Sequence, residues 1–109
     1  MSDREARIAK NEAISRDINE GIEEAMAQRS PEGFIRMACE CGRSSCERMF
    51  AITLEEYQGT RTDPRRFVVV DDHVIHDVER IVERTERYVV VEKRDGSASN
   101  IAEASDPRD

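Results

Sequence analysis

The chain has 109 residues, 38% of them charged, and a net charge of −7 at pH 7. A chain without a basic block lacks the electrostatic footprint of a nucleic-acid-binding protein, so we expect no nucleic-acid partner. It contains no apolar run of about 18 residues and no apolar leader segment, which predicts neither a membrane span nor a signal peptide. We therefore expect a cytoplasmic protein.

The first predicted element is a long helix from Ser2 to Gln28, because this stretch is rich in Ala, Glu and Arg and contains no proline. An apolar residue recurs at every fourth position along much of it. Such a row indicates the face by which a helix docks on its own domain, or in part on a second copy or another protein. The row consists of Ile14, Ile18, Ile22 and Met26.

Two short strands are predicted on either side of a cysteine-rich segment, Phe34–Ala38 before it and Arg48–Ile52 after it. Together they form a hairpin with the cysteines at its tip. Thr53 and Glu56 have the spacing of a capping box, which predicts that a short helix begins there. Phe67–Val70 is a β-branched run that is typical of a buried strand.

The last ordered element that we expect is a β-hairpin. Tyr88–Lys93 reads clearly as a strand, and a short turn joins it to Val78–Arg84, although the apolar spacing of Val78–Arg84 also suits a helix. From Arg94 onward the chain consists mainly of Gly, Ser, Ala, Asn and acidic residues, which predicts a disordered tail.

All three cysteines lie in one segment, Cys39-Glu-Cys-Gly-Arg-Ser-Ser-Cys46. Clustered cysteines in a chain without an export signal indicate a metal site, not a disulfide framework. Zinc takes four tetrahedral ligands with Zn–S distances of about 2.3 Å, so the chain has to curl between Cys39 and Cys41, and Gly42 permits that curl. Cys39, Cys41 and Cys46 are therefore the predicted zinc ligands.

Three thiolates leave a structural zinc site one ligand short, and histidine is the first choice for the fourth. The chain has two histidines. His73 directly follows the predicted strand, in a turn that could fold over the cysteines, which favours it over His76. A carboxylate from Asp71 or Asp72, or a ligand from a second chain, is the alternative.

A zinc ion closed by three cysteines and one histidine has no open position for water, so we expect no enzyme. The pattern of the zinc deaminases is absent, and no third group is recognisable that would orient a cysteine nucleophile. The expected function is that of a small zinc-binding protein acting as a non-enzymatic protein-interaction or regulatory module. The alternative is a redox switch, in which oxidation of the thiolates releases the zinc.

These elements predict an α+β fold in which zinc stabilises a small, mostly antiparallel β domain with one short helix. We expect any protein partner, or a second copy in a homodimer, to bind through the N-terminal helix. The predicted organisation is an N-terminal helical extension (1–33), a zinc-binding α+β domain (34–93) and a disordered tail (94–109).

Two resemblances add to this interpretation. The spacing C-x-C-x₄-C resembles the post-SET segment of histone methyltransferases, where three cysteines bind zinc with a fourth ligand from elsewhere, and the likeness covers the cysteine segment alone. A wider set of motifs spans most of residues 8–93, and its members are Asn11-Glu-Ala, Arg16, Asn19-Glu20, Cys39-Glu-Cys-Gly, Cys46, Glu56-Tyr57, Arg61, Asp63-Pro64, Phe67, His73, Val78-Glu-Arg and Tyr88-Val-Val-Val-Glu-Lys93.

In these motifs the chain resembles a family of small uncharacterised actinobacterial proteins with a zinc-finger-like C-x-C-G-x-x-x-C…H pattern. The resemblance implies a shared architecture, with His73 at the position of the family's histidine, and it implies no activity. The residues before that histidine are usually Pro-Gly in the family, whereas this chain has Asp71-Asp72, so the turn there can differ.

Overall fold

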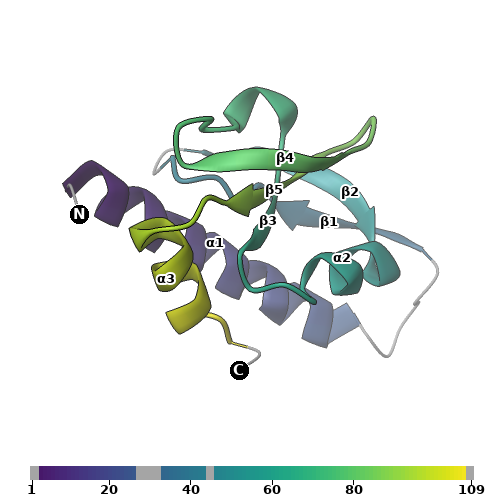
Figure 1. Cartoon of the computed structure of the whole chain (residues 1–109). Coiled ribbons are helices and arrows are strands. Elements are labelled where there is room, and N and C mark those ends of the chain that lie inside the picture. Colours follow the sequence, from purple (N-terminus) through teal and green to yellow (C-terminus); the bar gives the residue numbers. More distant parts are fainter. Residues whose placement is uncertain (1–2, 27–32, 44–45, 108–109) are drawn as a thin grey trace.

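The structure, a computed structural model, describes residues 3–26, 33–43 and 46–107. Its elements show the predicted α+β class, with a long N-terminal helix, small antiparallel sheets and a short helix after the first hairpin (Figure 1). In chain order they are α1 (Asp3–Met26), β1 (Phe34–Ala38), β2 (Met49–Thr53), α2 (Leu54–Thr60), β3 (Arg66–Val69), the 3-10 helix η1 (Asp71–His73), β4 (Glu79–Arg84), β5 (Val89–Lys93) and α3 (Ser97–Ala104).

The strands form two separate antiparallel sheets. β1 and β2 make a hairpin in which Ile35 pairs with Ile52 and Met37 pairs with Phe50. The second sheet has the strand order β3–β5–β4, so the predicted closing hairpin is confirmed as β4 and β5. The pairing of β4 with β5 is irregular between Ile81 and Glu83, and Val82 between them is 36% exposed.

α2 begins where the capping box predicts. The Thr53 hydroxyl accepts a hydrogen bond from the backbone N–H of Glu56 at 3.1 Å, and the Glu56 carboxylate accepts one from the N–H of Thr53 at 2.9 Å. This reciprocal pair satisfies amide groups that a helix start otherwise leaves without partners. The Glu56 carboxylate also accepts a hydrogen bond from Arg87 in the β4–β5 turn at 2.7 Å, which lowers the pKa of Glu56 to about 2. α2 is thereby joined to the second sheet.

The apolar core is one cluster that takes side chains from both sheets and from α2. Two of the predicted metal ligands, Cys39 and Cys41, belong to this cluster, so the hairpin tip is continuous with the core. Its most completely buried apolar members include Met37, Ile52, Tyr57, Phe67, Val69 and Val91.

α1 docks with a face that the sequence analysis did not single out. Ile14 and Ile18 are about half exposed, at 50% and 51%, whereas Ile22 and Met26 pack against the core. The prediction that the isoleucine row docks on the domain is therefore wrong for its first half. The buried positions are spaced by three and four residues, as one side of a helix requires, and they are Ala9, Glu12, Arg16 and Asn19.

A buried triad joins α1 to the second sheet. The ammonium group of Lys93 on β5 donates to the carboxyl groups of Glu12 on α1 and Glu79 on β4, and all three side chains are buried. Burial raises the pKa of Glu12 to about 8, although the nearby ammonium group acts in the opposite direction. Glu12 therefore keeps its proton near neutral pH and contacts the Lys93 ammonium group as a neutral acid.

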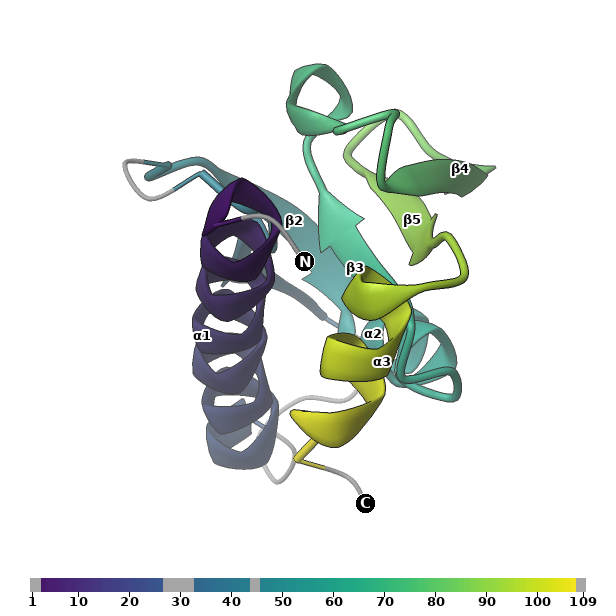
Figure 2. The same cartoon turned by 60° about the vertical axis from the view of Figure 1, so that its left-hand side comes forward.

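Arg16 joins α1 to the C-terminal part of the chain. Its guanidinium donates to the carbonyl oxygens of Pro64 at 2.6 Å and Ala102 at 2.7 Å, and it lies over the Phe67 ring. Ala102 belongs to α3, which lies beside α1 (Figure 2). The composition predicts a disordered tail from residue 94, whereas Ser97–Ala104 forms a helix, because the buried guanidinium needs the acceptors that this helix supplies.

α1 contacts both β1 and α3, so the predicted N-terminal extension packs against the rest of the chain. Although it is long, α1 is rich in charged residues. Within the described ranges, no helix combines the length and the apolar character that crossing a membrane requires.

The Glu12 triad should make stability depend on pH. A carboxyl group whose pKa is raised on folding stabilises the native state fully below its unfolded value of 4.5, and this contribution is lost as pH rises towards the folded value of about 8. Between about pH 6 and pH 8 we expect the free energy of unfolding to fall by about 1–2 kcal/mol. Glu12→Gln keeps the shape without the titration and should flatten the slope. Urea unfolding at several pH values measures both proteins, and equal slopes would contradict the role given to Glu12.

Candidate metal centre

Four donor side chains converge at the tip of the β1–β2 hairpin. Nδ1 of His73 lies 3.7 Å from Sγ of Cys39, 3.4 Å from Sγ of Cys41 and 3.3 Å from Sγ of Cys46. All four donor atoms lie within 4.8 Å of one another. With Zn–S near 2.3 Å and Zn–N of about 2.0–2.1 Å, tetrahedral geometry separates sulfur and nitrogen by about 3.6 Å. The four residues are therefore positioned to bind one metal ion, as the sequence predicts.

Two segments of the chain supply these donors. The cysteines lie in the connection between β1 and β2, and His73 is the last residue of η1, which follows β3. The N–H of His73 donates to the carbonyl oxygen of Val70 at 2.9 Å, which closes the turn and brings the imidazole over the hairpin tip. The alternatives His76, Asp71 and Asp72 are exposed, and among the described residues they are not part of the four-donor group.

Hydrogen bonds to sulfur prepare the cluster for a metal ion. The Cys39 thiol donates to the sulfur of Cys41, and this bond, supported by the backbone N–H of Arg43, lowers the pKa of Cys41 to about 5. The same bond, together with burial, raises the pKa of Cys39. A lowered pKa favours the thiolate, which is the form that metal ions bind. The backbone N–H of Val70 donates to Sγ of Cys39 at 3.2 Å and fixes its direction.

Glu40, between the first two cysteines, points into the core. Its Oε1 accepts a hydrogen bond from the N–H of Val68 at 2.9 Å. Its Oε2 accepts bonds from the Asn19 amide at 2.9 Å and from the Tyr57 hydroxyl at 2.8 Å. The flanking thiols face the His73 imidazole, whereas Glu40 points the other way, towards α1, α2 and β3.

The surroundings of Glu40 suit a charged carboxylate. Burial raises the pKa of Glu40, and the three donors oppose that effect. An ionised carboxylate can accept all three hydrogen bonds at once, whereas a protonated one would need an acceptor for its own proton. Arg61, whose positive charge also lowers this pKa, is itself buried. We therefore assign the ionised form to Glu40.

α1 holds the hairpin tip at two points. Asn19 donates to the carbonyl oxygen of Ala38 at 2.7 Å and accepts from its N–H at 2.8 Å, while Asn11 donates to the carbonyl oxygen of Gly42 at 3.0 Å. A Cβ on Gly42 would lie 2.3 Å from Cγ2 of Ile8. Gly42 does not have a positive φ, and among the described glycines Gly96 alone does. Glycine is therefore required at position 42 by the close approach of α1, not by the curl that the sequence suggested.

Cys46 is the accessible side of the cluster. Cys39 and Cys41 are 3% and 2% exposed and His73 is 8% exposed, whereas Cys46 is only half buried. It borders a hollow of about 360 Å³ whose other lining residues include Arg43 and Arg48. These two arginines bring positive charge close to the thiolates, and any reagent that approaches the ligands from solvent meets Cys46 first.

Sequence reasoning identified the four donors and missed the residues that hold them. Glu40, Asn19 and Asn11 fix the hairpin tip, yet none of them is a metal ligand or part of an apolar pattern. A signal for Glu40 was present in the C-x-C spacing, because the residue between two same-side thiols has to point away from the metal. Asn19 and Asn11 belong to the motifs of the sequence analysis, but their backbone partners are distant in the sequence, so the motifs did not reveal what these side chains bind.

Comparison of the chain with protein-family models, with curated proteins and with solved structures found no match. The chemistry of the centre is therefore interpreted from its own geometry.

His73→Ala removes one of the four donors, so we expect it to weaken zinc binding by at least about 10-fold. The effect should exceed that of removing a hydrogen bond to one of the ligands. It should also lower the melting temperature of the zinc-loaded protein, because metal binding in such a site is coupled to folding. His76 is an exposed histidine three positions later. His76→Ala is therefore the matched control and should change neither zinc binding nor the melting temperature. Competition with a zinc chelator of known affinity measures binding, and equal effects of the two substitutions would exclude His73 as the ligand.

Glu40→Gln places an amide NH₂ against donors that need an acceptor. We expect it to lower the free energy of unfolding by about 2–3 kcal/mol and to weaken zinc binding by about 10-fold, as lost supporting bonds do at metal sites. Glu47→Gln removes an exposed carboxylate from the same segment and serves as the control. Chemical unfolding and chelator competition measure the two effects, and a Glu40→Gln protein as stable as wild type would remove Glu40 from its supporting role.

Proposed function

We propose that this chain is a small zinc-binding protein in which the metal has a structural role, and that its surface serves protein interaction or regulation. The observation that carries the proposal is the group of three cysteine sulfurs and one imidazole nitrogen, gathered within 4.8 Å at the edge of the core.

The donor set favours zinc. Three thiolates and one imidazole are soft and borderline ligands, and tetrahedral sites of this composition are typical of structural zinc. Magnesium and calcium prefer oxygen ligands, and no carboxylate belongs to the group within the described part of the chain. The three cysteines are free thiols that lie together, which suits a reducing compartment such as the cytoplasm.

A structural role for the metal follows from the complete set of four protein donors. Four protein donors fill a tetrahedron, so a bound zinc ion would have no place for the water or substrate that a catalytic zinc holds. Three thiolates also donate electron density and make zinc a weaker Lewis acid. We therefore propose that the protein is not an enzyme and that the metal fastens the hairpin tip to η1.

The proposed interaction role rests on the surface of α1. The side of this helix that faces away from the core exposes Ile14 and Ile18 between charged residues. Exposed isoleucines on a regular helix are suited to contact another protein, because burying them in an interface is favourable.

A thiol redox switch is the second candidate, and the half-buried Cys46 is the observation that favours it. Oxidant that enters the adjoining hollow would reach this sulfur, and oxidation of one ligand would weaken the hold on the metal. Peroxide treatment distinguishes the candidates: zinc release at low oxidant, reversed by a thiol reductant, supports the switch. Release only under denaturing conditions supports a purely structural metal.

Elemental analysis tests the central proposal. Protein purified without a histidine tag should contain one zinc ion per chain, and removal of the metal should unfold much of the region around the hairpin. Apparent zinc-binding free energies of about 10–16 kcal/mol exceed the net stability of most small domains, which is why we expect this coupling. Circular dichroism before and after chelation follows the unfolding. A zinc content near zero, or a chain that keeps its fold and its thermal transition without metal, would contradict the proposal.

A further inference from the structure

The outward face of α1 is a stripe opposite its docked face, and we define it by Arg7, Lys10, Ile14, Ile18 and Glu24. All five side chains are exposed. Each helical residue turns the chain by about 100°, so Arg7, Ile14 and Ile18 lie on the side opposite Glu12 and Arg16, and Lys10 and Glu24 lie at one margin. The stripe runs from cations through isoleucines to a carboxylate.

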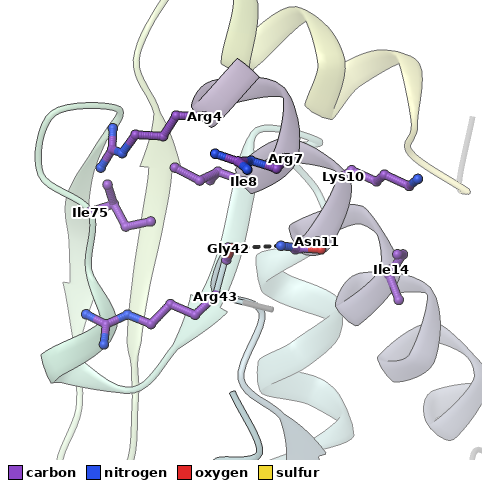
Figure 3. Close-up of a pocket in the computed structure, with 9 residues that line it drawn as sticks. All are labelled: Arg4, Arg7, Ile8, Lys10, Asn11, Ile14, Gly42, Arg43 and Ile75. Atoms are coloured by element: carbon purple, nitrogen blue, oxygen red, sulfur yellow. Dashed lines mark hydrogen bonds between the residues drawn. The ribbon is translucent and has the colours of Figure 1, made fainter. Parts of the chain in front are cut away.

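Two hollows of opposite charge lie at the two ends of this stripe. The first, of about 860 Å³, is lined by Arg4, Arg7, Lys10 and Arg43 together with Ile14, and no described carboxylate lines it (Figure 3). Arg4 forms an ion pair with Asp77 at 3.0 Å, whereas no ion pair involves Arg7 or Lys10 within the described ranges. In a chain with a net charge of −7, this hollow is a local site for an acidic group.

The second hollow, of about 700 Å³, lies near the other end of α1 and is lined mainly by carboxylates. Two of them, Asp17 and Glu24, are exposed. No arginine or lysine is among its described lining residues. α1 therefore offers both a cationic and an anionic surface, with Ile14 and Ile18 between them.

This order of side chains is complementary to itself under a two-fold rotation. If two copies of α1 lie antiparallel with the rotation axis midway between Ile14 and Ile18, each Ile14 faces the other copy's Ile18. Arg7 lies nine residues before that midpoint and Glu24 eight residues after it, or about 13.5 Å and 12 Å along the helix. Glu24 is rotated by about 100° from Arg7 around the helix and shares a margin with Lys10, which lies six residues, or about 9 Å, before the midpoint. Lys10 of one copy therefore lies beside Glu24 of the other, and Arg7 lies nearer the centre of the contact. A two-fold interface requires this kind of self-complementary surface.

We propose that α1 pairs antiparallel with α1 of a second copy of this chain, through the outward face. Glu24 of the other copy then lies beside Lys10, at the margin of the cationic hollow. Gly21 supports this arrangement: it is exposed within the helix, where glycine is unfavourable, and a Cβ there would meet nothing within 4 Å in its own chain. A small residue allows the backbone of a second helix to approach closely. The inference rests on the proposed interaction role, but not on the identity of the metal.

The composition of the outward face also sets the expected affinity of the dimer. Two isoleucines provide little apolar area compared with a stable interface of about 1,200–2,000 Å², so we expect a dissociation constant of about 10 μM. Charge pairs at both ends of the stripe carry much of the recognition, and salt screens such exposed pairs. Raising the ionic strength from about 0.05 M to 0.5 M should therefore weaken the dimer by about 10-fold.

Sedimentation velocity on the zinc-loaded protein at low salt, from about 1 μM to 200 μM, tests the proposal. One variant, Arg7→Glu with Lys10→Glu, makes the outward face acidic at both ends, and the other, Asp17→Lys with Glu24→Lys, makes it basic. Each alone should remain monomeric at concentrations where the wild type is dimeric, whereas an equimolar mixture should form a heterodimer. Arg36→Glu and Glu86→Lys change exposed charges elsewhere and should leave the dimer intact.

All substituted residues are exposed, and circular dichroism on each variant verifies that it is folded. A wild type that stays monomeric over the whole range would overturn the proposal, as would a mixture that does not associate. If the monomeric wild type binds a fluorescent acidic peptide, and the variant with Arg7→Glu and Lys10→Glu does not, the cationic hollow is a site for a different protein instead. Zinc content measured on the same samples keeps the two proposals apart, because a zinc-loaded monomer contradicts the pairing alone.

Discussion

The alternation of side chains along Cys39, Glu40 and Cys41 is the constraint on which the rest of the structure depends. One short segment sends two sulfurs towards the metal position and one carboxylate into the core, where α1, α2 and β3 each provide a donor. The metal centre and the packing of the chain are therefore two sides of the same backbone. A displacement that opens the sulfur cluster also moves Glu40 away from Asn19 and Tyr57, so metal affinity and fold stability cannot vary independently here.

Buried polar groups fix the arrangement of the elements more than they add to its stability. The Glu12 triad and the Arg16 guanidinium are removed from water, and the cost of desolvation offsets much of what their pairing contributes. These bonds have few alternative geometries, however, because each joins atoms of different elements. Arg16 needs carbonyl oxygens from both Pro64 and Ala102, which a rotated or shifted α1 would not reach. In our proposal the bound zinc supplies stabilisation that a core of this size cannot.

Local signals let the sequence predict the strands, the α2 capping box and the four donors. Thr53 and Glu56 interact across three residues, and the cysteines lie within one short segment, so their spacing alone is informative. The docked face of α1 and the existence of α3 had no such signal, because the partners of Arg16 are backbone oxygens distant in the sequence. The isoleucine row was misleading for the same reason: hydrophobic periodicity identifies a docked face only when the docking is apolar. Arg16 and Asn19, which belong to the motifs of the sequence analysis, are among the buried polar residues.

The separate contacts that Asn19 and Asn11 make with the hairpin tip also determine which side of α1 faces solvent. Asn19 binds Ala38 directly before the first cysteine, and Asn11 binds Gly42 directly after the second. A helix held at two points eight residues apart, about 12 Å along its axis, cannot rotate without breaking one of them. The same two contacts that brace the sulfur cluster therefore keep Ile14 and Ile18 turned outward. Under the proposed zinc binding, loss of the metal would free the segment between Ala38 and Gly42 and weaken both contacts, leaving Arg16 and the Glu12 triad to orient α1. The state of the metal and the presentation of the outward face are therefore coupled through the hairpin tip.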